Sequence, residues 1–176
     1  MRYHMGMADY QRISHGFGPV FDERSRVLVL GSFPSVLSRE ASFYYGNPRN
    51  RFWRVMGEAL GEPGLAQEDV AGKRAALLRH GVALWDVVES CEVRGSSDAS
   101  IRDVVPVDVA RIVRVAPICA VICNGGTAGR LYRRWLLPAC GIEAEVLPST
   151  SPANASWSLA RLTERWREAL LAALEA

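Results

Sequence analysis

The sequence predicts an α/β fold, a three-layer αβα sandwich around a central, mainly parallel four-stranded sheet. Three observations lead to this prediction. Four short apolar runs each end in polar or turn residues, which is typical of buried parallel strands. Segments with apolar side chains at helical spacing lie between these runs. The chain has 176 residues, 49% of them hydrophobic, which is enough apolar material for one core and one domain.

The predicted strands share one pattern, an apolar run followed directly by glycine, proline or a polar residue. They are expected at 26–30, 82–85, 118–123 and 143–147. In an open parallel sheet, ligands bind outside the carboxyl ends of the strands. We therefore expect the segments that follow the strands to converge on one edge and form a site, namely 31–35, Asp86, 124–126 and 148–151.

The predicted helices carry apolar residues three or four positions apart along one face. They are expected at 51–60, 68–79, 107–115, 127–136 and 157–174. Residues 1–20 contain several glycines and a proline and lack any period, so they are predicted to form an irregular N-terminal arm. The chain from 1 to 176 is otherwise expected to be a single domain.

The composition excludes several classes of protein. No apolar run reaches the roughly 18 residues that a membrane span needs, and the start lacks the apolar core of a secretion signal. We therefore expect a cytoplasmic protein with no membrane partner. The four cysteines form no Cys-x-x-Cys pair, so we expect no metal site, no disulfide framework and no cofactor. Lys73 is the single lysine beside twenty arginines, which leaves few amines for Schiff-base chemistry.

Two of the segments after the first strand carry groups suited to a flat ligand. In the segment 31–35, glycine and proline favour a tight turn, and its serines and amides can hold an anion or a polar ring, although an ordinary turn would look the same. The segment 43–53 places three consecutive aromatic residues beside arginines and asparagines, as base-stacking sites do. Within it, Asn50 can cap the following helix, hold a water molecule for attack, or do both.

The two later segments offer amide and hydroxyl groups. Asn124 precedes two glycines, and its amide can read the polar edge of a heterocycle or simply form a turn. The serine-rich loop 147–155 is stiffened by two prolines and can clamp a phosphate backbone or cap the last helix. The three histidines do not stand at predicted strand ends, so a Ser-His-Asp arrangement is not expected.

Taken together, these segments resemble the uracil-DNA glycosylase superfamily over roughly residues 26–160. Within the superfamily, the segments 31–35, 45–53 and 84–88 are most similar to the hypoxanthine (deoxyinosine) DNA glycosylases, and 95–98 and 149–152 fit that family too. Phe33 stands where mismatch-specific uracil glycosylases carry an asparagine that activates water. The classical uracil enzymes carry a catalytic aspartate in the first motif, and this sequence has none there. They also carry a histidine in the last motif, where the segment 149–152 stands without one.

The resemblance implies a role for each site residue. It makes Asn50 the catalytic asparagine, Asn124 the reader of the base and Tyr45 its stacking partner, with Ser32 and Phe33 completing the base site. It also implies DNA contacts for a set of rim residues, Ser35, Arg49, Ser149, Thr150 and Ser151. Asn47 replaces a histidine that is usual before the proline. These assignments require Tyr45, Asn50 and Asn124 to line one slot sized for a planar ring.

The function that the resemblance implies is a monofunctional DNA glycosylase of base excision repair. Such an enzyme hydrolyses the N-glycosidic bond of a deaminated base, here hypoxanthine, uracil or xanthine, after the base is flipped out of damaged DNA. It is expected to act as a monomer without a cofactor. The alternatives are a mismatch-specific uracil or thymine glycosylase, a DNA-binding module of the same fold without catalysis, and a small-molecule enzyme on the same sheet.

Overall fold

The centre of the molecule is a four-stranded parallel sheet, seen in a computed structural model that describes residues 9–94 and 100–176. Its strands, in the order β3-β2-β6-β7, are β2 (Val27–Gly31), β3 (Val82–Asp86), β6 (Ala120–Asn124) and β7 (Ala144–Leu147). All three pairings are parallel. The predicted sheet is therefore confirmed, and each strand lies within about two residues of its expected position.

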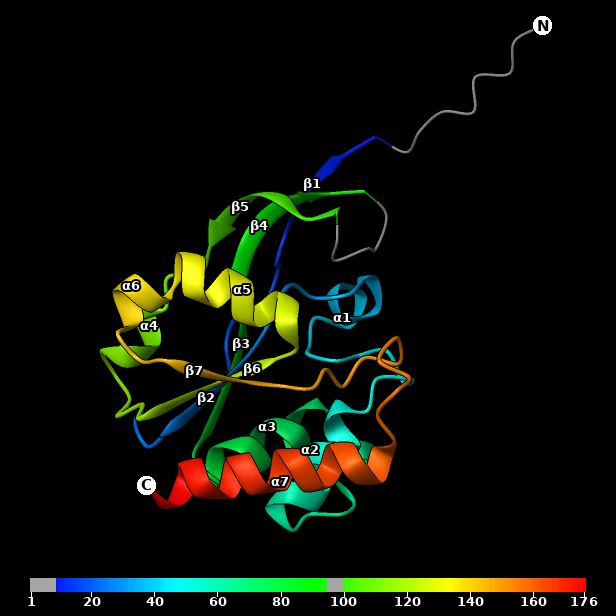
Figure 1. The fold of residues 1–176 in the computed structure, drawn as a ribbon, viewed down its shortest axis with the longest axis vertical. Helices are drawn as coiled ribbons and strands as arrows, with labels where there is room; N and C mark the ends of the chain where they lie inside the picture. The colour runs from blue at the N-terminus through cyan, green and yellow to red at the C-terminus, as the bar shows by residue number, and fades with distance from the viewer. Residues whose placement is uncertain (1–8, 95–99) are drawn as a thin grey trace, which may run out of the picture.

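Two helical layers cover the sheet and complete the predicted αβα sandwich. One layer holds α2 (Phe52–Leu60), the short η1 (Leu65–Gln67), α3 (Val70–Arg79) and α7 (Leu159–Glu175), and the other holds α4 (Ala110–Val113), α5 (Gly126–Trp135) and α6 (Leu137–Cys140). Figure 1 shows the sheet edge-on between them. The short α1 (Val36–Ala41) follows the carboxyl end of β2.

The core forms because β2 and β3 are buried on both faces and are apolar up to Gly31 and Asp86, their last residues. The outer edge of β3 is covered by the N-terminal segment, where Val20 and Leu84 exchange two backbone hydrogen bonds of 2.9 Å. Below the sheet, the ring of Phe52 packs edge-on against the buried Trp166, with 6.1 Å between centroids, and this contact joins α2 to α7. The same contact supports the loop that precedes α7.

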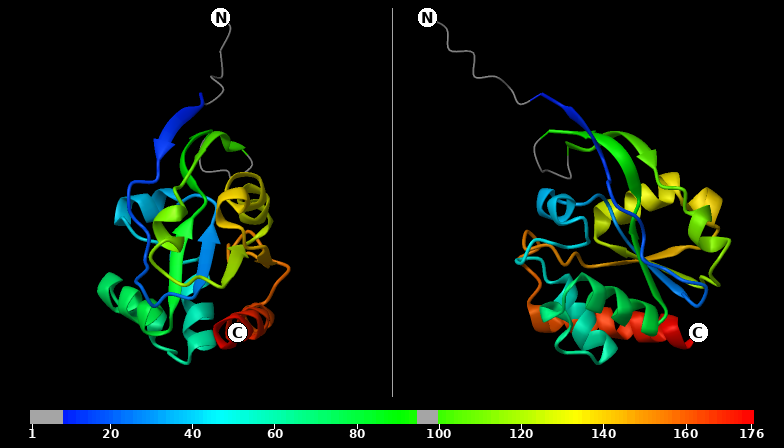
Figure 2. Two further views of the ribbon diagram at one scale, coloured as in Figure 1. Left: turned by 90° about the vertical axis from the view of Figure 1, so that its left-hand side faces the viewer. Right: turned by 180° about the vertical axis from the view of Figure 1, so that it is seen from behind.

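A second, antiparallel sheet was not predicted. It consists of β1 (Gln11–Ser14), β4 (Val88–Val93) and β5 (Arg102–Pro106) in the order β1-β4-β5. Figures 1 and 2 show it above the parallel sheet, where β4 continues from β3 after the single residue Val87. Residues 1–20 are thus not irregular throughout, because 11–14 pair with β4; residues 1–8 lie outside the described residues.

The pattern of exposure explains why β1 escapes a hydrophobicity-based prediction. Three of its four residues are exposed, so its sequence carries no apolar alternation, and backbone pairing with β4 holds it in place. Among the described residues, no helix is both long enough and apolar enough to cross a membrane.

Candidate active site

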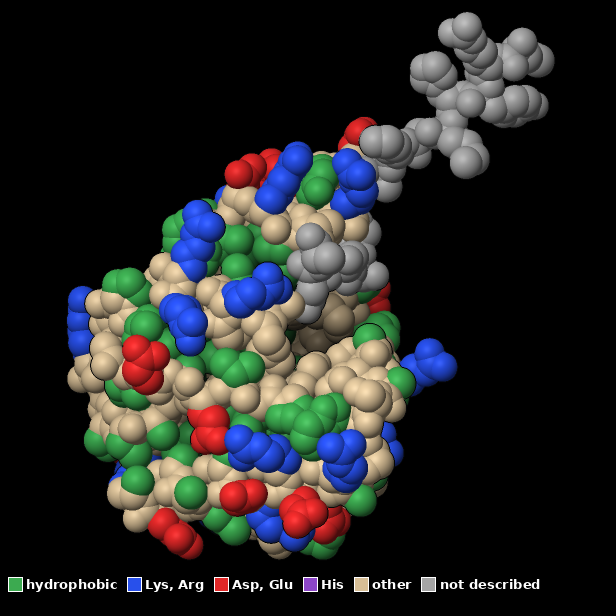
Figure 3. All heavy atoms as spheres, in the orientation of Figure 1, with side chains coloured by type: hydrophobic (Ala, Val, Ile, Leu, Met, Phe, Trp, Pro, Cys, Tyr) green, Lys and Arg blue, Asp and Glu red, His purple; other side chains and the backbone are tan. Residues whose placement is uncertain are grey.

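A cavity of about 610 Å³ opens at the carboxyl end of the parallel sheet. All four segments expected to converge there line it, together with residues of α1 and of the second sheet. In Figure 3 the surface is hollowed to the right of centre, at this edge of the sheet. The placement follows from the register, because Gly31 pairs with Asp86 and Asn124 pairs with Leu147, so the strand ends lie side by side.

The floor of the cavity depends on the absence of a side chain at Gly31. A Cβ atom there would lie 2.4 Å from Oδ1 of Asp86 and 2.9 Å from the hydroxyl oxygen of Tyr45. Neither distance is possible for a carbon atom, so only glycine allows these two polar groups to approach the backbone. Next to it, Ser32 and the half-buried Phe33 line the cavity as expected.

Tyr45 presents an aromatic ring to the cavity from a strained backbone. Its φ angle of 53° lies in the left-handed region, which costs a residue with a side chain free energy. One face of the ring stacks on Phe52, with 4.0 Å between centroids and 22° between planes. Since Phe52 covers that face, the opposite face is the one that a planar ligand in the cavity can meet.

Asn50 fills one of the two roles that its sequence position left open, because its side chain binds the first backbone N–H of α2. Its Oδ1 accepts a hydrogen bond of 2.9 Å from the backbone N–H of Phe52, the first residue of α2, and another of 2.8 Å from the Thr150 hydroxyl. Both lone pairs of the carbonyl oxygen are therefore engaged. The hydrogens on Nδ2 are what this amide can offer to a molecule in the cavity.

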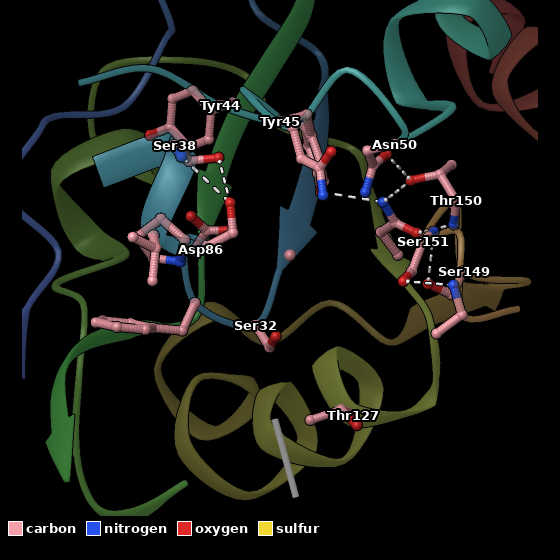
Figure 4. A pocket seen from close by; sticks show the side chains of 18 of the residues that line it. Ser32, Ser38, Tyr44, Tyr45, Asn50, Asp86, Thr127, Ser149, Thr150 and Ser151 are labelled. Atoms are coloured by element: carbon pink, nitrogen blue, oxygen red, sulfur yellow. Dashed lines mark hydrogen bonds between the residues drawn. The ribbon is translucent and has the colours of Figure 1, made fainter. Parts of the chain in front are cut away.

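Asn124 is tied to the same network through Thr150. Its Nδ2 donates to the Tyr45 hydroxyl at 3.0 Å and to Oγ1 of Thr150 at 2.9 Å, while its Oδ1 accepts from the Thr150 N–H at 3.0 Å. Figure 4 shows Tyr45, Asn50 and Thr150 along one side of the cavity. The structure thus brings Tyr45, Asn50 and Asn124 together in one continuous chain of hydrogen bonds.

Arg51 holds the loop that carries Thr150. Its backbone N–H donates to the Thr150 carbonyl at 3.1 Å, and its guanidinium group donates to the carbonyls of Ser151 at 3.0 Å, Asn154 at 3.1 Å and Trp157. The planar fork of arginine suits several acceptors at once. Because Arg51 follows Asn50 directly, the same turn of chain fixes both sides of the Asn50–Thr150 contact.

The expected DNA-contact residues fall into three groups. Ser35, Ser149 and Ser151 line the cavity, and Ser35 also caps α1 by accepting a hydrogen bond of 3.2 Å from Ser38 N–H. Thr150 is fully buried, so its hydroxyl serves Asn50 and Asn124 and is not presented at the surface. Arg49 is exposed and is not among the lining residues.

Two further elements of the resemblance have different outcomes. Asn47 lines the cavity, and its Oδ1 accepts a hydrogen bond of 3.0 Å from the N–H of Arg49, so its side chain shapes the turn before Asn50. The segment 95–98 lies outside the described residues.

Sequence reasoning did not identify the pair formed by His15 and Asp86. Asp86 lines the cavity but is only 4% exposed, and its Oδ2 lies 2.7 Å from Nε2 of the fully buried His15. Asp86 stood at a predicted strand end, which was a usable signal. His15 had none, because it follows β1, and the pairing that brings it to Asp86 leaves no mark in the hydrophobic pattern.

The carboxylate of Asp86 influences its neighbour Tyr44. Burial raises the pKa of the Tyr44 phenol, and the negative charges of Asp86 and then Tyr45 raise it further. The Tyr44 hydroxyl therefore stays protonated and donates to the carbonyl of Gly18 at 2.8 Å. This bond ties the N-terminal segment to the aromatic loop beside the cavity.

Comparison with known proteins identifies the family to which this site belongs. The family model described as the uracil DNA glycosylase superfamily matches residues 19–175. The chain belongs to the uracil DNA glycosylase superfamily. Two curated relatives in it carry the name hypoxanthine DNA glycosylase. That of Methanosarcina acetivorans is 39% identical over 153 residues, and that of Methanosarcina barkeri is 36% identical over 155 residues.

These two glycosylases match nearly end to end, covering 86% and 88% of this chain and 95% and 96% of their own lengths. A solution NMR structure of a Methanosarcina acetivorans protein, named as a candidate uracil DNA glycosylase, superposes with a TM-score of 0.79 at 36% identity. That comparison covers 94% of this chain and all of the other. The superfamily member described here therefore shares the whole α/β fold of that protein.

The described part of this superfamily member holds no candidate metal centre. Among residues 9–94 and 100–176, no group of three or more His, Cys, Asp or Glu side chains is arranged to hold a metal ion. Asp86 and His15 contact each other through a hydrogen bond between Oδ2 and Nε2.

Proposed function

We propose that this protein is a monofunctional DNA glycosylase that removes deaminated bases, hypoxanthine foremost, by hydrolysing the N-glycosidic bond in damaged DNA. The observation that carries the proposal is the chain of hydrogen bonds joining Tyr45, Asn124, Thr150 and Asn50 along the wall of one cavity. The names of the two curated relatives favour hypoxanthine, and the name of the solved structure keeps uracil as a second candidate substrate.

The base must leave the duplex before these groups can reach it. Flipping costs a few kcal/mol, least at a mismatched or damaged pair. In the cavity, the flipped ring would stack on the face of Tyr45 that Phe52 does not cover, between Ser32, Phe33 and the polar wall. Asn124 has both Nδ2 hydrogens engaged by the protein, so the remaining lone pair of its Oδ1 is what it offers to the base.

Asn50 would act by positioning. Hydrolysis passes through an oxocarbenium-like sugar, and its Nδ2 hydrogens can hold the oxygen of the attacking water. An amide is too weak a base to remove the water's proton, so catalysis must depend largely on positioning and on stabilising the departing base. Deaminated bases suit such a site because their anions delocalise over an oxo-substituted ring.

The position of Lys73 supports hydrolysis without strand cleavage. Lys73, the single lysine, lies on α3 over the ring of Trp53 in α2. It is not among the residues that line the cavity, so it is not placed to form a Schiff base with the sugar. At the rim, Ser35, Ser149, Ser151 and the exposed Arg49 would contact the DNA backbone.

The test is product analysis on a panel of duplexes carrying deoxyinosine, uracil, xanthine or mismatched thymine, at stated salt concentrations. We expect release of free base and an abasic strand that breaks only after alkali, with deoxyinosine the best substrate. Faster release from uracil or mismatched thymine would favour the second candidate. Salt-sensitive DNA binding without release of any base would identify a binding module and contradict the proposal.

A further inference from the structure

The steps proposed above make no use of Asp86, although it is the most unusual group in the cavity. Burying a carboxylate is costly unless the charge is paired or hydrogen-bonded. The side chain of Asp86 is 6% exposed, yet it lines the cavity in which a ligand would sit. Figure 4 shows it across the cavity from Asn50 and Thr150.

The two oxygens of Asp86 have different surroundings. Oδ2 lies 2.7 Å from Nε2 of His15, whose ring is fully buried against Phe17, with 4.4 Å between ring centroids. Oδ1 and the Tyr45 hydroxyl both lie close to Gly31, at 2.4 Å and 2.9 Å from the place of a Cβ atom there. His15 therefore anchors one oxygen and leaves the other directed to the part of the cavity where Tyr45 would stack a base.

A carboxylate at this point restricts which atom of a ligand can face it. An ionised carboxylate only accepts hydrogen bonds, so the atom that faces it must carry a hydrogen. Deamination of adenine converts N1 of the ring from an acceptor into an N–H donor, and deamination of cytosine does the same at N3. The same acceptor therefore favours hypoxanthine and uracil and repels the lone pair of the undamaged base.

The other polar groups on the wall do not supply this discrimination as directly. Oδ1 of Asn50 already accepts two bonds, and Oδ1 of Asn124, which accepts from the Thr150 N–H, offers one lone pair of a neutral amide. An amide can also present either a donor or an acceptor by turning over, whereas a carboxylate cannot become a donor without a proton.

We propose that Asp86 is the specificity-determining residue that accepts a hydrogen bond from the ring N–H created by deamination, with His15 as the residue that positions it. The inference rests on the proposed glycosylase function and names the feature of the base that this site selects. Guanine already carries an N1–H, so Asp86 does not reject it, and its exclusion must come from other contacts around its amino group.

The test compares two bases in the same duplex, hypoxanthine and unsubstituted purine, which has a lone pair at N1. Single-turnover release of each is measured for the parent protein, Asp86→Asn and Asp86→Ala. Asparagine keeps an oxygen for His15, and alanine removes every acceptor. We expect each variant to release hypoxanthine at least about tenfold more slowly, while release of purine, compared with the parent's own purine rate, stays level or rises.

A matched control is Glu89→Gln, which neutralises an exposed carboxylate three residues away that does not line the cavity. It should leave both rates unchanged. A second measurement does not depend on catalysis: binding of duplexes that carry the same two bases on 2′-fluoro-arabinose, which resists hydrolysis. The parent protein should prefer hypoxanthine, and both Asp86 variants should lose that preference.

The outcomes separate the two proposals. Equal losses for hypoxanthine and purine, or unchanged selectivity in both the release and the binding experiments, would overturn the role of Asp86 and leave the glycosylase function intact. No release of any deaminated base by the parent protein would overturn the glycosylase function and this inference with it.

Discussion

The hydroxyl of Thr150 donates a hydrogen bond of 2.8 Å to Oδ1 of Asn50, from a loop one hundred residues further along the chain. Oγ1 of Thr150 in turn accepts from Nδ2 of Asn124. The orientation of the proposed catalytic amide is therefore set before any substrate enters, and preorganisation of this kind lowers the barrier without further rearrangement.

The first prediction concerns this hydroxyl. Thr150→Val keeps the shape of the side chain and the backbone N–H but removes the link between Asn50 and Asn124. We expect the single-turnover rate to fall by about tenfold or more, with a loss of stability of about 1–3 kcal/mol from the unsatisfied buried partners. Thr150→Ser retains the hydroxyl and should stay close to the parent. Equal activity of the valine and serine variants would remove the hydroxyl from the mechanism.

The second prediction concerns Asn50 itself. Asn50→Ala removes the group that would hold water, so base release should fall by at least about a hundredfold, a loss typical of a misplaced reacting group. The affinity for DNA should change little, and loss of the bond to Phe52 N–H should cost about 1 kcal/mol of stability. Glu89→Gln, whose side chain is exposed and does not line the cavity, serves as the control and should release base at the parent's rate. Undiminished release by Asn50→Ala would exclude Asn50 as the catalytic residue.

The third prediction separates the ring of Tyr45 from its hydroxyl. Tyr45→Phe keeps the stack on Phe52 and loses the acceptor for Asn124, whereas Tyr45→Ala loses the platform itself. Stacking contributes about 1–3 kcal/mol per base, so the alanine variant should bind a duplex with a non-cleavable lesion about tenfold more weakly. The phenylalanine variant should bind nearly as the parent does. Similar binding by all three proteins would show that the base does not stack there.

The fourth prediction concerns Arg51 and the loop that it holds. Arg51→Lys retains the charge but cannot reach the carbonyls of Ser151, Asn154 and Trp157 together. We expect faster amide hydrogen exchange across residues 150–157 and a slower catalytic rate with little change in KM. Arg49→Lys, on the exposed side of the same turn, is the matched control and should leave exchange in the loop unchanged.

The fifth prediction follows from the burial of Cys123. Burial raises the pKa of its thiol to about 12, so at neutral pH it is protonated as well as covered. An alkylating reagent should label the exposed Cys119 in the native protein and reach Cys123 only after unfolding. Mass spectrometry of the labelled peptides measures this, and native labelling of Cys123 would show that β6 opens readily.

The parallel sheet and the position of the site could be predicted because both depend on the order of apolar runs. β2 and β3 are buried on both faces, so their sequences are apolar up to Gly31 and Asp86, and the polar segments lie at the edge where the strands end. The expected convergence of Tyr45 and Asn50 with Asn124 came from the family resemblance, because Tyr45 and Asn50 lie between α1 and α2 and not at the end of a strand. The family resemblance, with the loop residues that carry it, supplied the roles.

The second sheet and the Asp86–His15 pair could not be predicted in the same way. β1 and β5 are largely exposed, so backbone pairing and not apolar spacing defines them. His15 and Asp86 are 71 residues apart, and nothing in the local pattern of either one indicates the other. The central place of Thr150 also depends on side-chain geometry, because only the folded loop shows that its hydroxyl faces two amides.

The loop from 148 to 157 is fastened at both ends to the helices below the sheet. The guanidinium group of Arg51 donates to the carbonyls of Asn154 and Trp157 near the end of the loop. At its start, Nε1 of Trp166, which lies in α7, donates to the carbonyl of Pro148 at 2.9 Å. During synthesis on a ribosome, the parallel strands emerge before Trp166 does. A nascent chain halted ahead of that tryptophan has every strand and the Arg51 contacts, but the carbonyl of Pro148 gains its partner only when the last helix docks.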